Sequence, residues 1–248
     1  MNHLRHGSTA KSGESGRLSG FLADADTGDP LVVGGLVPFS TIDYPGRLSA
    51  VVFCQGCPWA CGYCYNPHLR PRTAHAVEPW PKVMAWLDSR RGLLDAVVFS
   101  GGEPLLQHGL SEAARQARAP GFCIGLHTAG IYPARFAEVL PFMDWVGFDV
   151  KAPFDRYRQV TGAENGGAAR RSLTHLLTSG TSHEVRCTVD ESLLSPQDAR
   201  QMAEQLTDLG VYRLVLQAAR RADGTVRPIS EMFIDAVKAE MKRVELRV

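Results

Sequence analysis

The sequence predicts an α/β fold in which a parallel sheet is covered by helices. Apolar runs rich in β-branched residues recur along the chain, and each is followed by a stretch with helical apolar spacing or good helix formers. The apolar runs are nearly continuous, which is typical of parallel strands buried on both faces. The periodicity leaves open whether the sheet is an open doubly wound sheet or curls into a barrel.

Six apolar runs are predicted strands, and the six stretches that follow them are predicted helices. We expect the strands at residues 48–54, 95–100, 122–127, 145–150, 184–189 and 212–217. We expect the helices at residues 80–87, 105–119, 133–140, 168–178, 196–209 and 229–244. Six such units fit a chain of 248 residues that forms one domain.

The helix expected at residues 196–209 has the clearest end signals. Ser195 can cap it through its hydroxyl, Pro196 suits the first helical position, and Asp198 stands where the acid of a capping box belongs. Gly210 follows the last apolar residue and ends the helix.

The first 30 residues differ from the rest of the chain. They are rich in Gly, Ser, Asp and Thr and show little apolar periodicity, so we expect residues 1–30 to form a flexible lead-in. Residues 31–248 are predicted to form the core domain.

Composition and charge describe an ordinary soluble globular protein. Hydrophobic residues make up 44% of the chain, charged residues 21%, and the net charge is +1, which gives no signature of nucleic-acid or membrane-surface binding. The arginine pairs at residues 170–171 and 220–221 are interpreted as solvated faces. No apolar run has membrane-spanning length, and the N-terminus lacks the apolar core of a signal peptide. We expect a cytoplasmic protein with neither a nucleic-acid partner nor a membrane partner.

The most informative stretch is the cysteine loop, residues 54–67, which reads C-Q-G-C-P-W-A-C-G-Y-C-Y-N-P. Within it, Cys57, Cys61 and Cys64 stand at C-x-x-x-C-x-x-C spacing. Three thiolates on one short loop converge readily on an iron–sulfur cluster, which prefers cysteine ligands. Three cysteine ligands leave one iron of a four-iron cluster without a protein ligand. A substrate or cofactor can bind to that iron, so the motif predicts a catalytic cluster as well as a structural one.

A structural zinc site made by these three cysteines with Cys54 is the alternative. Zinc ribbons usually divide their cysteines into two separated pairs, whereas these four share one loop. Cys54 ends an apolar run, where a buried free thiol is common. Disulfides are disfavoured because the chain is long, has six cysteines and shows no secretion signal.

Polar and glycine-rich residues gather where the predicted strands end. The cysteine loop follows the first strand, residues 100–104 follow the second, residues 127–130 end the third, and residues 149–151 end the fourth. Arg186 lies on the fifth strand. Because the carboxyl ends of parallel strands meet at one edge, we expect a single active site there.

The segment Ser100-Gly101-Gly102-Glu103-Pro104 has two interpretations. Its glycines let a ligand approach the backbone, and Glu103 offers an acceptor to an amine. Taken alone, the segment is more typical of an ordinary turn. Its place beside the cysteine loop favours a functional role.

These motifs together resemble the radical S-adenosylmethionine (radical SAM) superfamily. The cysteine spacing with Tyr63 before the third cysteine, and the Gly101-Gly102-Glu103-Pro104 segment, are two signatures of that superfamily. The run from Pro38 to Gly46, P-F-S-T-I-D-Y-P-G, resembles the activating enzymes of glycyl-radical enzymes. Among these, the anaerobic ribonucleoside-triphosphate reductase activating proteins are the most similar. The resemblance covers residues 34–217.

The resemblance implies a fold and two cofactors. The fold would be a partial (β/α)6 TIM-like barrel with an open lateral side, the radical SAM core. Cys57, Cys61 and Cys64 would hold a 4Fe-4S cluster, whose open iron would bind the amino and carboxylate groups of S-adenosyl-L-methionine. Gly101, Gly102 and Glu103 would receive the amino group. The other implied cofactor-binding residues are Tyr63, beside the adenine, and Thr128, Asp149, Lys151 and Arg186.

The resemblance also implies the reaction and its partners. An external one-electron donor such as flavodoxin or ferredoxin would reduce the cluster, and cleavage of S-adenosylmethionine would give a 5′-deoxyadenosyl radical. That radical would remove a hydrogen atom from a glycine of a glycyl-radical enzyme, the anaerobic ribonucleotide reductase. No catalytic residue beyond the cluster and cofactor is implied.

Three hypotheses remain open from the sequence. The first is this activase, and the second is a small radical SAM enzyme with a low-molecular-weight substrate, such as a deazapurine synthase. The third is a non-catalytic zinc module that binds a protein. Two residues depart from the activase pattern, because His127 stands where related proteins carry Asp and Tyr65 where many carry His. Asp149 and Lys151 could also form only a structural ion pair.

Overall fold

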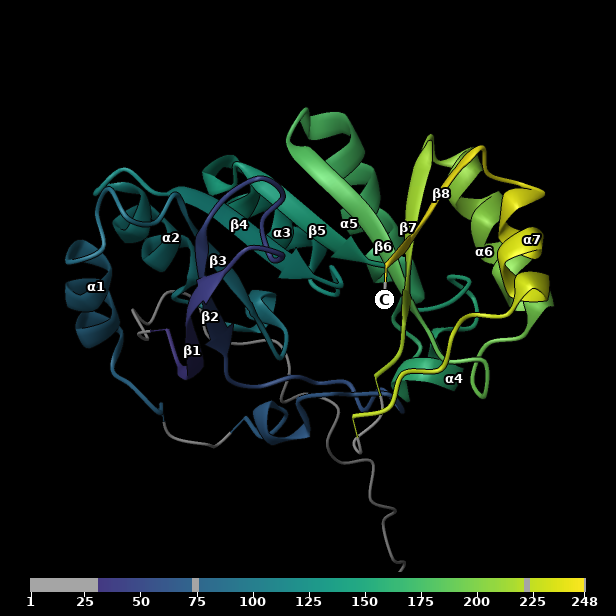
Figure 1. The fold of residues 1–248 in the computed structure, drawn as a ribbon, viewed down its shortest axis with the longest axis horizontal. Coiled ribbons are helices and arrows are strands. Elements are labelled where there is room, and N and C mark those ends of the chain that lie inside the picture. Colours follow the sequence, from purple (N-terminus) through teal and green to yellow (C-terminus); the bar gives the residue numbers. More distant parts are fainter. Residues whose placement is uncertain (1–30, 73–75, 221–223, 248) are drawn as a thin grey trace, which may run out of the picture.

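The computed structural model describes residues 31–72, 76–220 and 224–247, so the predicted lead-in, residues 1–30, lies outside the described residues. Within them, eight strands form one sheet in the order β1 to β8 (Figure 1). Strand β1 (Val33–Ser40) is antiparallel to β2 (Ser49–Cys54), and every later neighbour pair is parallel. The later strands are β3 (Ala96–Gly101), β4 (Cys123–Thr128), β5 (Trp145–Asp149), β6 (Ser182–Val189), β7 (Arg213–Ala218) and β8 (Arg243–Arg247).

Helices connect the parallel strands and cover the outer side of the sheet (Figure 1). The covering helices are α1 (Trp80–Asp88), α2 (Leu110–Arg118), α3 (Pro133–Val139), α5 (Gly166–Ser179), α6 (Pro196–Asp208) and α7 (Glu231–Lys238). A short helix, α4 (Tyr157–Thr161), lies at the carboxyl end of the sheet. Short 3-10 turns occur at η2 (Pro67–Leu69), η3 (Pro104–Leu106) and η4 (Leu140–Phe142). The apolar strands are thus buried between helices outside and side chains within.

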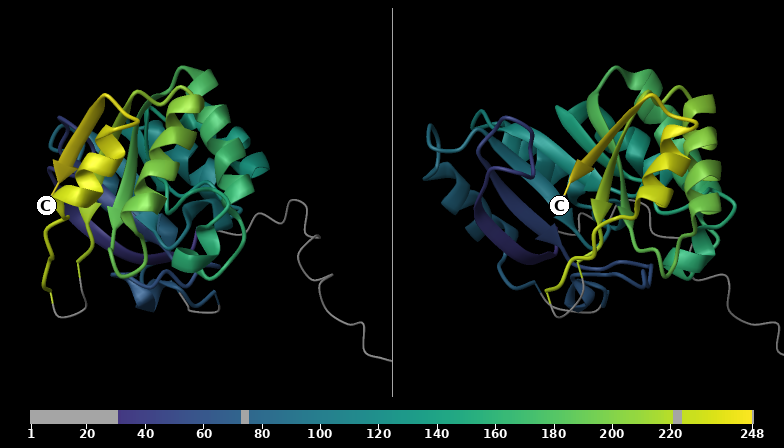
Figure 2. Two further views of the ribbon diagram at one scale, coloured as in Figure 1. Left: turned by 90° about the vertical axis from the view of Figure 1, so that its right-hand side faces the viewer. Right: turned by 45° about the vertical axis from the view of Figure 1, so that its right-hand side comes forward.

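The sheet arches around its inner side without closing (Figures 1 and 2). The two edges are β1, in purple, and β8, in yellow, and no ladder joins them in the part of the chain that the structure describes. Strands twist with a fixed hand, so a run of parallel strands curls in one direction as it grows. The predicted α/β fold, a partial TIM-like barrel with an open lateral side, is confirmed.

Several element boundaries differ from the sequence expectation. The helix expected at residues 229–244 ends at Lys238, and the chain then forms β8, whose alternating Arg-Val-Glu-Leu-Arg pattern suits a half-exposed edge strand. Strand β1 was not predicted, because its Gly-Gly pair weakens a strand pattern. The helix expected at residues 105–119 is split into η3 and α2, and the break contains Gly109.

The start of α6 forms as predicted. The Ser195 hydroxyl accepts a hydrogen bond from the Asp198 backbone N–H at 3.2 Å, and the Asp198 carboxylate accepts one from the Ser195 backbone N–H at 2.9 Å. This reciprocal pair satisfies two backbone donors that a helix start would otherwise leave unpaired.

The loop between β1 and β2 folds into the barrel and fills its amino-terminal end. Tyr44 is buried there against Trp145 of β5, with ring centroids 5.4 Å apart. His127 of β4 holds the same loop, because its Nε2 lies 2.8 Å from the Asp43 carbonyl oxygen. A carbonyl oxygen only accepts, so Nε2 carries the proton, and Nδ1 faces the Ser100 hydroxyl at 3.4 Å. The barrel is therefore open toward only one end.

Among the described helices, none combines the length and the apolar character that crossing a membrane requires.

Folding is expected to become less favourable at mildly acid pH because of His127. Burial, followed by the charge of Arg186, lowers the pKa of His127 to about 3. An unfolded histidine titrates near pH 6.5, so between about pH 6.5 and pH 3 the unfolded chain binds the extra proton and stability falls as pH falls. When the pH falls from 7 to 5, protonation of His127 in the unfolded chain lowers the free energy of unfolding by roughly 2 kcal/mol.

Denaturant unfolding of the wild type and of His127→Gln, at pH 7 and at pH 5, measures how much stability His127 costs the protein on acidification. The glutamine variant should be less stable at pH 7 yet should lose about 2 kcal/mol less on acidification. Equal pH dependence of the two proteins would show that His127 is not held neutral.

Candidate active site

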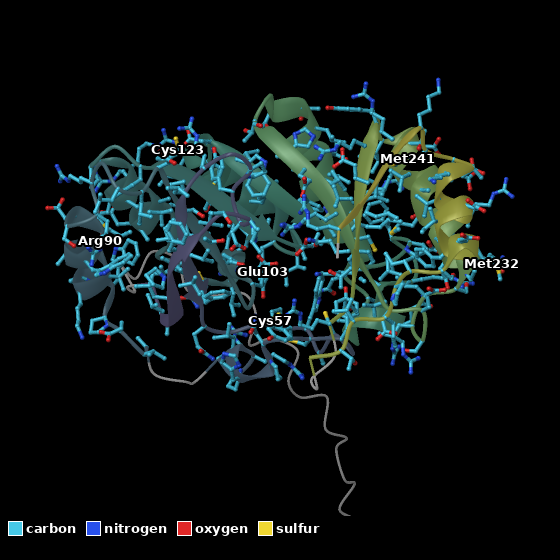
Figure 3. All side chains as sticks on the ribbon, in the orientation of Figure 1. Cys57, Arg90, Glu103, Cys123, Met232 and Met241 are labelled. Carbon is cyan, nitrogen blue, oxygen red and sulfur yellow. The ribbon has the colours of Figure 1, made fainter. Side chains whose placement is uncertain are left out.

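A cavity of about 300 Å³ lies at the carboxyl ends of the strands. The cysteine loop crosses below these strand ends in the view of Figure 1. Figure 3 shows Cys57 and Glu103 adjacent within this inner region. The structure brings every predicted site residue to the wall of this one cavity. They are Cys57, Cys61, Tyr63, Cys64, Gly101, Gly102, Glu103, Thr128, Asp149, Lys151 and Arg186.

The cysteine loop is held in place by backbone hydrogen bonds to helix α4. Ala60 N–H donates to the Thr161 carbonyl at 2.9 Å, and Gly62 N–H donates to the Val160 carbonyl at 3.2 Å. The last carbonyls of a helix have no partner within the helix, so the loop satisfies them. The middle of the loop is therefore fixed between β2 and α4.

Two of the three proposed ligands, Cys57 and Cys61, are buried enough to be protonated on their own. Burial raises the pKa of Cys57 to about 11 and also raises the pKa of Cys61. A buried thiolate requires a nearby positive charge, and a metal centre provides one while releasing the proton. The chemistry of the three thiols thus suits a metal centre.

The arrangement of the thiols fits a cluster better than a single zinc ion. Among the described residues, no group of three or more His, Cys, Asp or Glu side chains lies close enough together to hold one metal ion. A four-iron cluster presents a separate iron to each thiolate, so its ligands stand farther apart than those of one ion. Cys54 is 0% exposed on β2, within the core, and does not line the cavity.

The Gly-Gly-Glu turn packs directly against the cysteine loop. A side chain on Gly102 would place its Cβ 2.2 Å from the Gly56 carbonyl oxygen, and one on Gly101 would lie 2.5 Å from the Cys54 nitrogen. Glu103 N–H donates to the same Gly56 carbonyl at 2.9 Å. Both positions therefore require glycine for contact with the protein's own backbone, whereas the sequence suggested ligand access as the reason.

Glu103 is buried, 3% exposed, and has one free acceptor position. Its carboxylate accepts hydrogen bonds from Thr128 Oγ1 at 2.6 Å, Ala129 N–H at 3.0 Å and Leu105 N–H at 3.1 Å. An ionised carboxylate offers about four acceptor positions, so three are filled by the protein. Burial raises the pKa of Glu103 against the effect of these hydrogen bonds. A cationic amine is the donor that would complete its environment.

Asp149 joins two cations in the cavity wall. Arg186 Nε lies 2.7 Å from one carboxylate oxygen, and Lys151 Nζ lies 3.5 Å from the other. Burial alone would raise the pKa of Asp149, but the charges of Arg186 and Lys151 outweigh burial and hold it well below its usual range. Burial likewise opposes the charge on Lys151, yet Asp149 keeps the Lys151 pKa well above its usual range. The triad therefore carries a net positive charge.

Tyr63 contributes a polar atom without a partner. Its hydroxyl is buried and has no hydrogen-bond partner among the described residues, while Lys151 Nζ lies 5.8 Å from the centre of its ring. Buried polar atoms in native proteins are rarely left unpaired. The hydroxyl therefore indicates that this wall faces a bound molecule.

Sequence reasoning missed several residues of the cavity wall. Trp59 and Arg70 line it, although nothing in the spacing of the motif singled them out. Arg220 is exposed, as expected of a solvated loop, but it also lines the cavity and lies 5.7 Å from the ring centre of Tyr65. Trp59 lies within the cysteine motif itself, whereas only the folded structure brings Arg70 and Arg220 to the cavity.

Comparison with known families identifies the domain. The model of the radical SAM superfamily matches residues 51–209. The chain is 31% identical over 196 residues to a Methanocaldococcus jannaschii protein classed among the glycyl-radical enzyme activating enzymes, covering 74% of this chain and 78% of that protein. It is 33% identical over 135 residues to the pyruvate formate-lyase-activating enzyme of Clostridium pasteurianum, covering 51% and 55% of the two chains. It is also 26% identical to the 7-carboxy-7-deazaguanine synthase of Geobacter sulfurreducens, covering 78% and 85%.

Solved structures share the fold at low sequence identity. Streptococcus suis SuiB bound to S-adenosylmethionine superposes with a TM-score of 0.60 at 10% identity, covering 78% of this chain. The chain spans about half of that larger protein, 48% of its length. QueE from Escherichia coli superposes with a TM-score of 0.55 at 17% identity, covering 88% of this chain and 93% of QueE.

The family match spans most of the chain and includes the cysteine loop, the Gly-Gly-Glu turn and the ends of the strands that line the cavity. The chain belongs to the radical SAM superfamily, and it is an enzyme that uses a 4Fe-4S cluster and S-adenosylmethionine for radical chemistry.

Proposed function

We propose that this enzyme is an activase, which generates a glycyl radical on a partner enzyme, the anaerobic ribonucleoside-triphosphate reductase. The observation that carries the proposal is the 31% identity, over about three quarters of both chains, to a protein classed among such activating enzymes. The open lateral side of the barrel supports it, since a backbone loop of a large partner can reach the cavity from there. The run from Pro38 to Gly46 supports the choice of reductase.

In this proposal Cys57, Cys61 and Cys64 hold the cluster and leave its fourth iron free. Two observations support this assignment. The three cysteines line one cavity and offer only sulfur atoms as ligands. Among the described residues, no group of side chains lies close enough together to hold a single metal ion. Cys54 is a core thiol with no part in it.

The same cavity would hold S-adenosylmethionine beside the cluster. Glu103 is assigned to the amino group, because a cation completes the acceptors of its buried carboxylate. Gly101 and Gly102 present the neighbouring backbone. Tyr63 would lie beside the adenine, and Thr128, Asp149, Lys151 and Arg186 would orient the carboxylate and ribose.

The protein's contribution to the reaction is orientation, charge and exclusion of water. When bound, the cluster and S-adenosylmethionine supply a 5′-deoxyadenosyl radical, using one electron from an external donor such as flavodoxin or ferredoxin. Lys151 and Arg186 carry positive charge in the cavity wall, which would attract the carboxylate of the cofactor. A docked partner loop would cover the open side, which keeps water away from the radical. We place this chemistry in the cytoplasm.

A deazapurine synthase is the second candidate. The deazaguanine synthase of G. sulfurreducens matches this chain over 85% of its own length and 78% of this chain, so the two have nearly the same extent. A barrel of this size suits a small heterocyclic substrate as well as a peptide loop.

Removing any one of the three proposed ligands should abolish chemistry. In anaerobically reconstituted protein, Cys57→Ala, Cys61→Ala and Cys64→Ala should each lower cleavage of S-adenosylmethionine by more than about 100-fold, because an incomplete ligand set loses the cluster. Cys54→Ala is the matched control and should keep wild-type iron content and cleavage. Loss of iron in the Cys54 variant equal to that of the other three would show the ligand assignment to be wrong.

Replacing Glu103 tests the amino-group assignment. Glu103→Gln keeps the size of the side chain but removes its charge, so anaerobic calorimetry on cluster-loaded protein should find affinity for S-adenosylmethionine lowered by about 10- to 100-fold. Glu112→Gln, at an exposed ion pair on α2, should bind as the wild type does. Unchanged affinity in Glu103→Gln would mean that the amino group binds elsewhere.

Incubation with a candidate partner distinguishes the two functions. Reduced enzyme, S-adenosylmethionine and an anaerobic ribonucleotide reductase should give a glycine-centred doublet in the electron spin resonance spectrum of the partner. A variant of the partner that lacks the glycine is the control and should give no doublet. Turnover of a small heterocyclic substrate, with no doublet on any glycyl-radical enzyme offered, would favour the deazapurine synthase.

A further inference from the structure

Two residues of the cavity wall have buried donors that nothing in the described chain satisfies. Trp59 Nε1 and Arg70 Nε are buried and lack hydrogen-bond partners among the described residues, and both residues line the cavity with the cysteines. Neither has a role in the assignments above. Native proteins rarely leave buried donors unpaired, so these two indicate acceptors that the polypeptide does not supply.

Trp59 is held rigidly inside the cysteine loop. It lies midway between Cys57 and Cys61, is 3% exposed, and packs edge-on against Tyr157 of α4 with ring centroids 5.7 Å apart. The indole N–H can only donate, and the packed ring cannot turn to seek another partner. Its acceptor therefore lies next to the loop that surrounds the proposed metal centre.

Arg70 is attached to the same loop from its other end. Its backbone carbonyl accepts a hydrogen bond from Cys57 N–H at 3.1 Å, which fixes η2 alongside the first proposed ligand. The guanidinium is half-buried, and no ion pair of Arg70 occurs among the residues that the structure describes. A partly buried cation without a counter-charge favours an anionic neighbour.

A cluster bound by the cysteine loop would offer acceptor sulfur atoms in the cavity that both residues line. Three thiolates and the bridging sulfides give a ligated cluster net negative charge, and one electron from an external donor adds another. We propose that the Trp59 indole N–H and the Arg70 Nε–H donate hydrogen bonds to the sulfur atoms of the cluster held by Cys57, Cys61 and Cys64, and thereby raise its reduction potential. Hydrogen bonds to cluster sulfurs stabilise the reduced, more negative state.

The proposal rests on the cysteine ligation but on neither the partner nor the substrate. The experiment uses the full chain, reconstituted anaerobically, without any partner, and first measures iron content to establish the cluster. The midpoint potential is then obtained by redox titration of the wild type, Trp59→Phe and Arg70→Gln. Trp59→Phe keeps an aromatic ring and removes only the N–H. Trp86→Phe, on α1, is the matched control.

Each of the two variants should show a more negative midpoint potential at unchanged iron content. Loss of one charge-assisted hydrogen bond should lower the equilibrium constant for reduction by about tenfold, which is about 59 mV for a one-electron couple. Trp86→Phe should match the wild type. Unchanged potentials, together with weaker binding of S-adenosylmethionine, would overturn the proposal and assign both donors to that cofactor.

A measurement on the wild type removes any dependence on how the variants fold. Protein labelled with ¹⁵N only in the tryptophan indole, reduced with dithionite, should show hyperfine coupling of one ¹⁵N nucleus to the reduced cluster in pulsed electron spin resonance. The same label in Trp59→Phe should show none if the variant retains its cluster. Absence of ¹⁵N coupling in the wild type would overturn the proposal for Trp59.

Discussion

The site depends on the contact between the cysteine loop and the Gly101–Glu103 turn. Gly102 N–H donates to the Cys54 carbonyl and Glu103 N–H to the Gly56 carbonyl, both at 2.9 Å. Because β2 and β3 are parallel neighbours, these bonds continue their ladder beyond the strand ends. They place the first cysteine of the motif beside a buried carboxylate, and they do so only because two residues lack side chains. Without this contact the thiols and Glu103 would not share a cavity.

Charge explains why the site suits two charged cofactors. Cys57 and Cys61 are too buried to ionise alone, and Asp149 is balanced by both Arg186 and Lys151. The buried carboxylate of Glu103 keeps one acceptor position free. The polypeptide thus leaves positive charge on one side and an acceptor on the other, as a molecule with both an amino and a carboxylate group requires. Trp59, Tyr63 and Arg70 also line the cavity, and each has a buried polar atom without a hydrogen-bond partner among the described residues. A bound cofactor would supply these partners.

Sequence reasoning reached the fold and the cavity because both follow local patterns. Continuous apolar strands and a capped helix such as α6 are visible along the chain, and residues at the ends of parallel strands must meet. Strand β8 was lost inside a longer predicted helix, since a five-residue edge strand has little apolar signal. Gly102 is required because a side chain there would clash with the Gly56 carbonyl, and only the folded structure shows this contact. The folded structure likewise shows that Trp59 and Arg70 line the cavity, which the spacing of the motif did not indicate. The roles of the cavity residues in binding remain predictions.

The central claim is that three thiolates hold a cluster whose fourth iron binds S-adenosylmethionine directly. Mössbauer spectroscopy of ⁵⁷Fe-reconstituted protein, before and after addition of S-adenosylmethionine, tests it most directly. One iron in four should change its isomer shift toward that of a six-coordinate site while the other three stay as they were. Four irons with unchanged parameters would mean that the polypeptide fills the fourth position, and would contradict the claim.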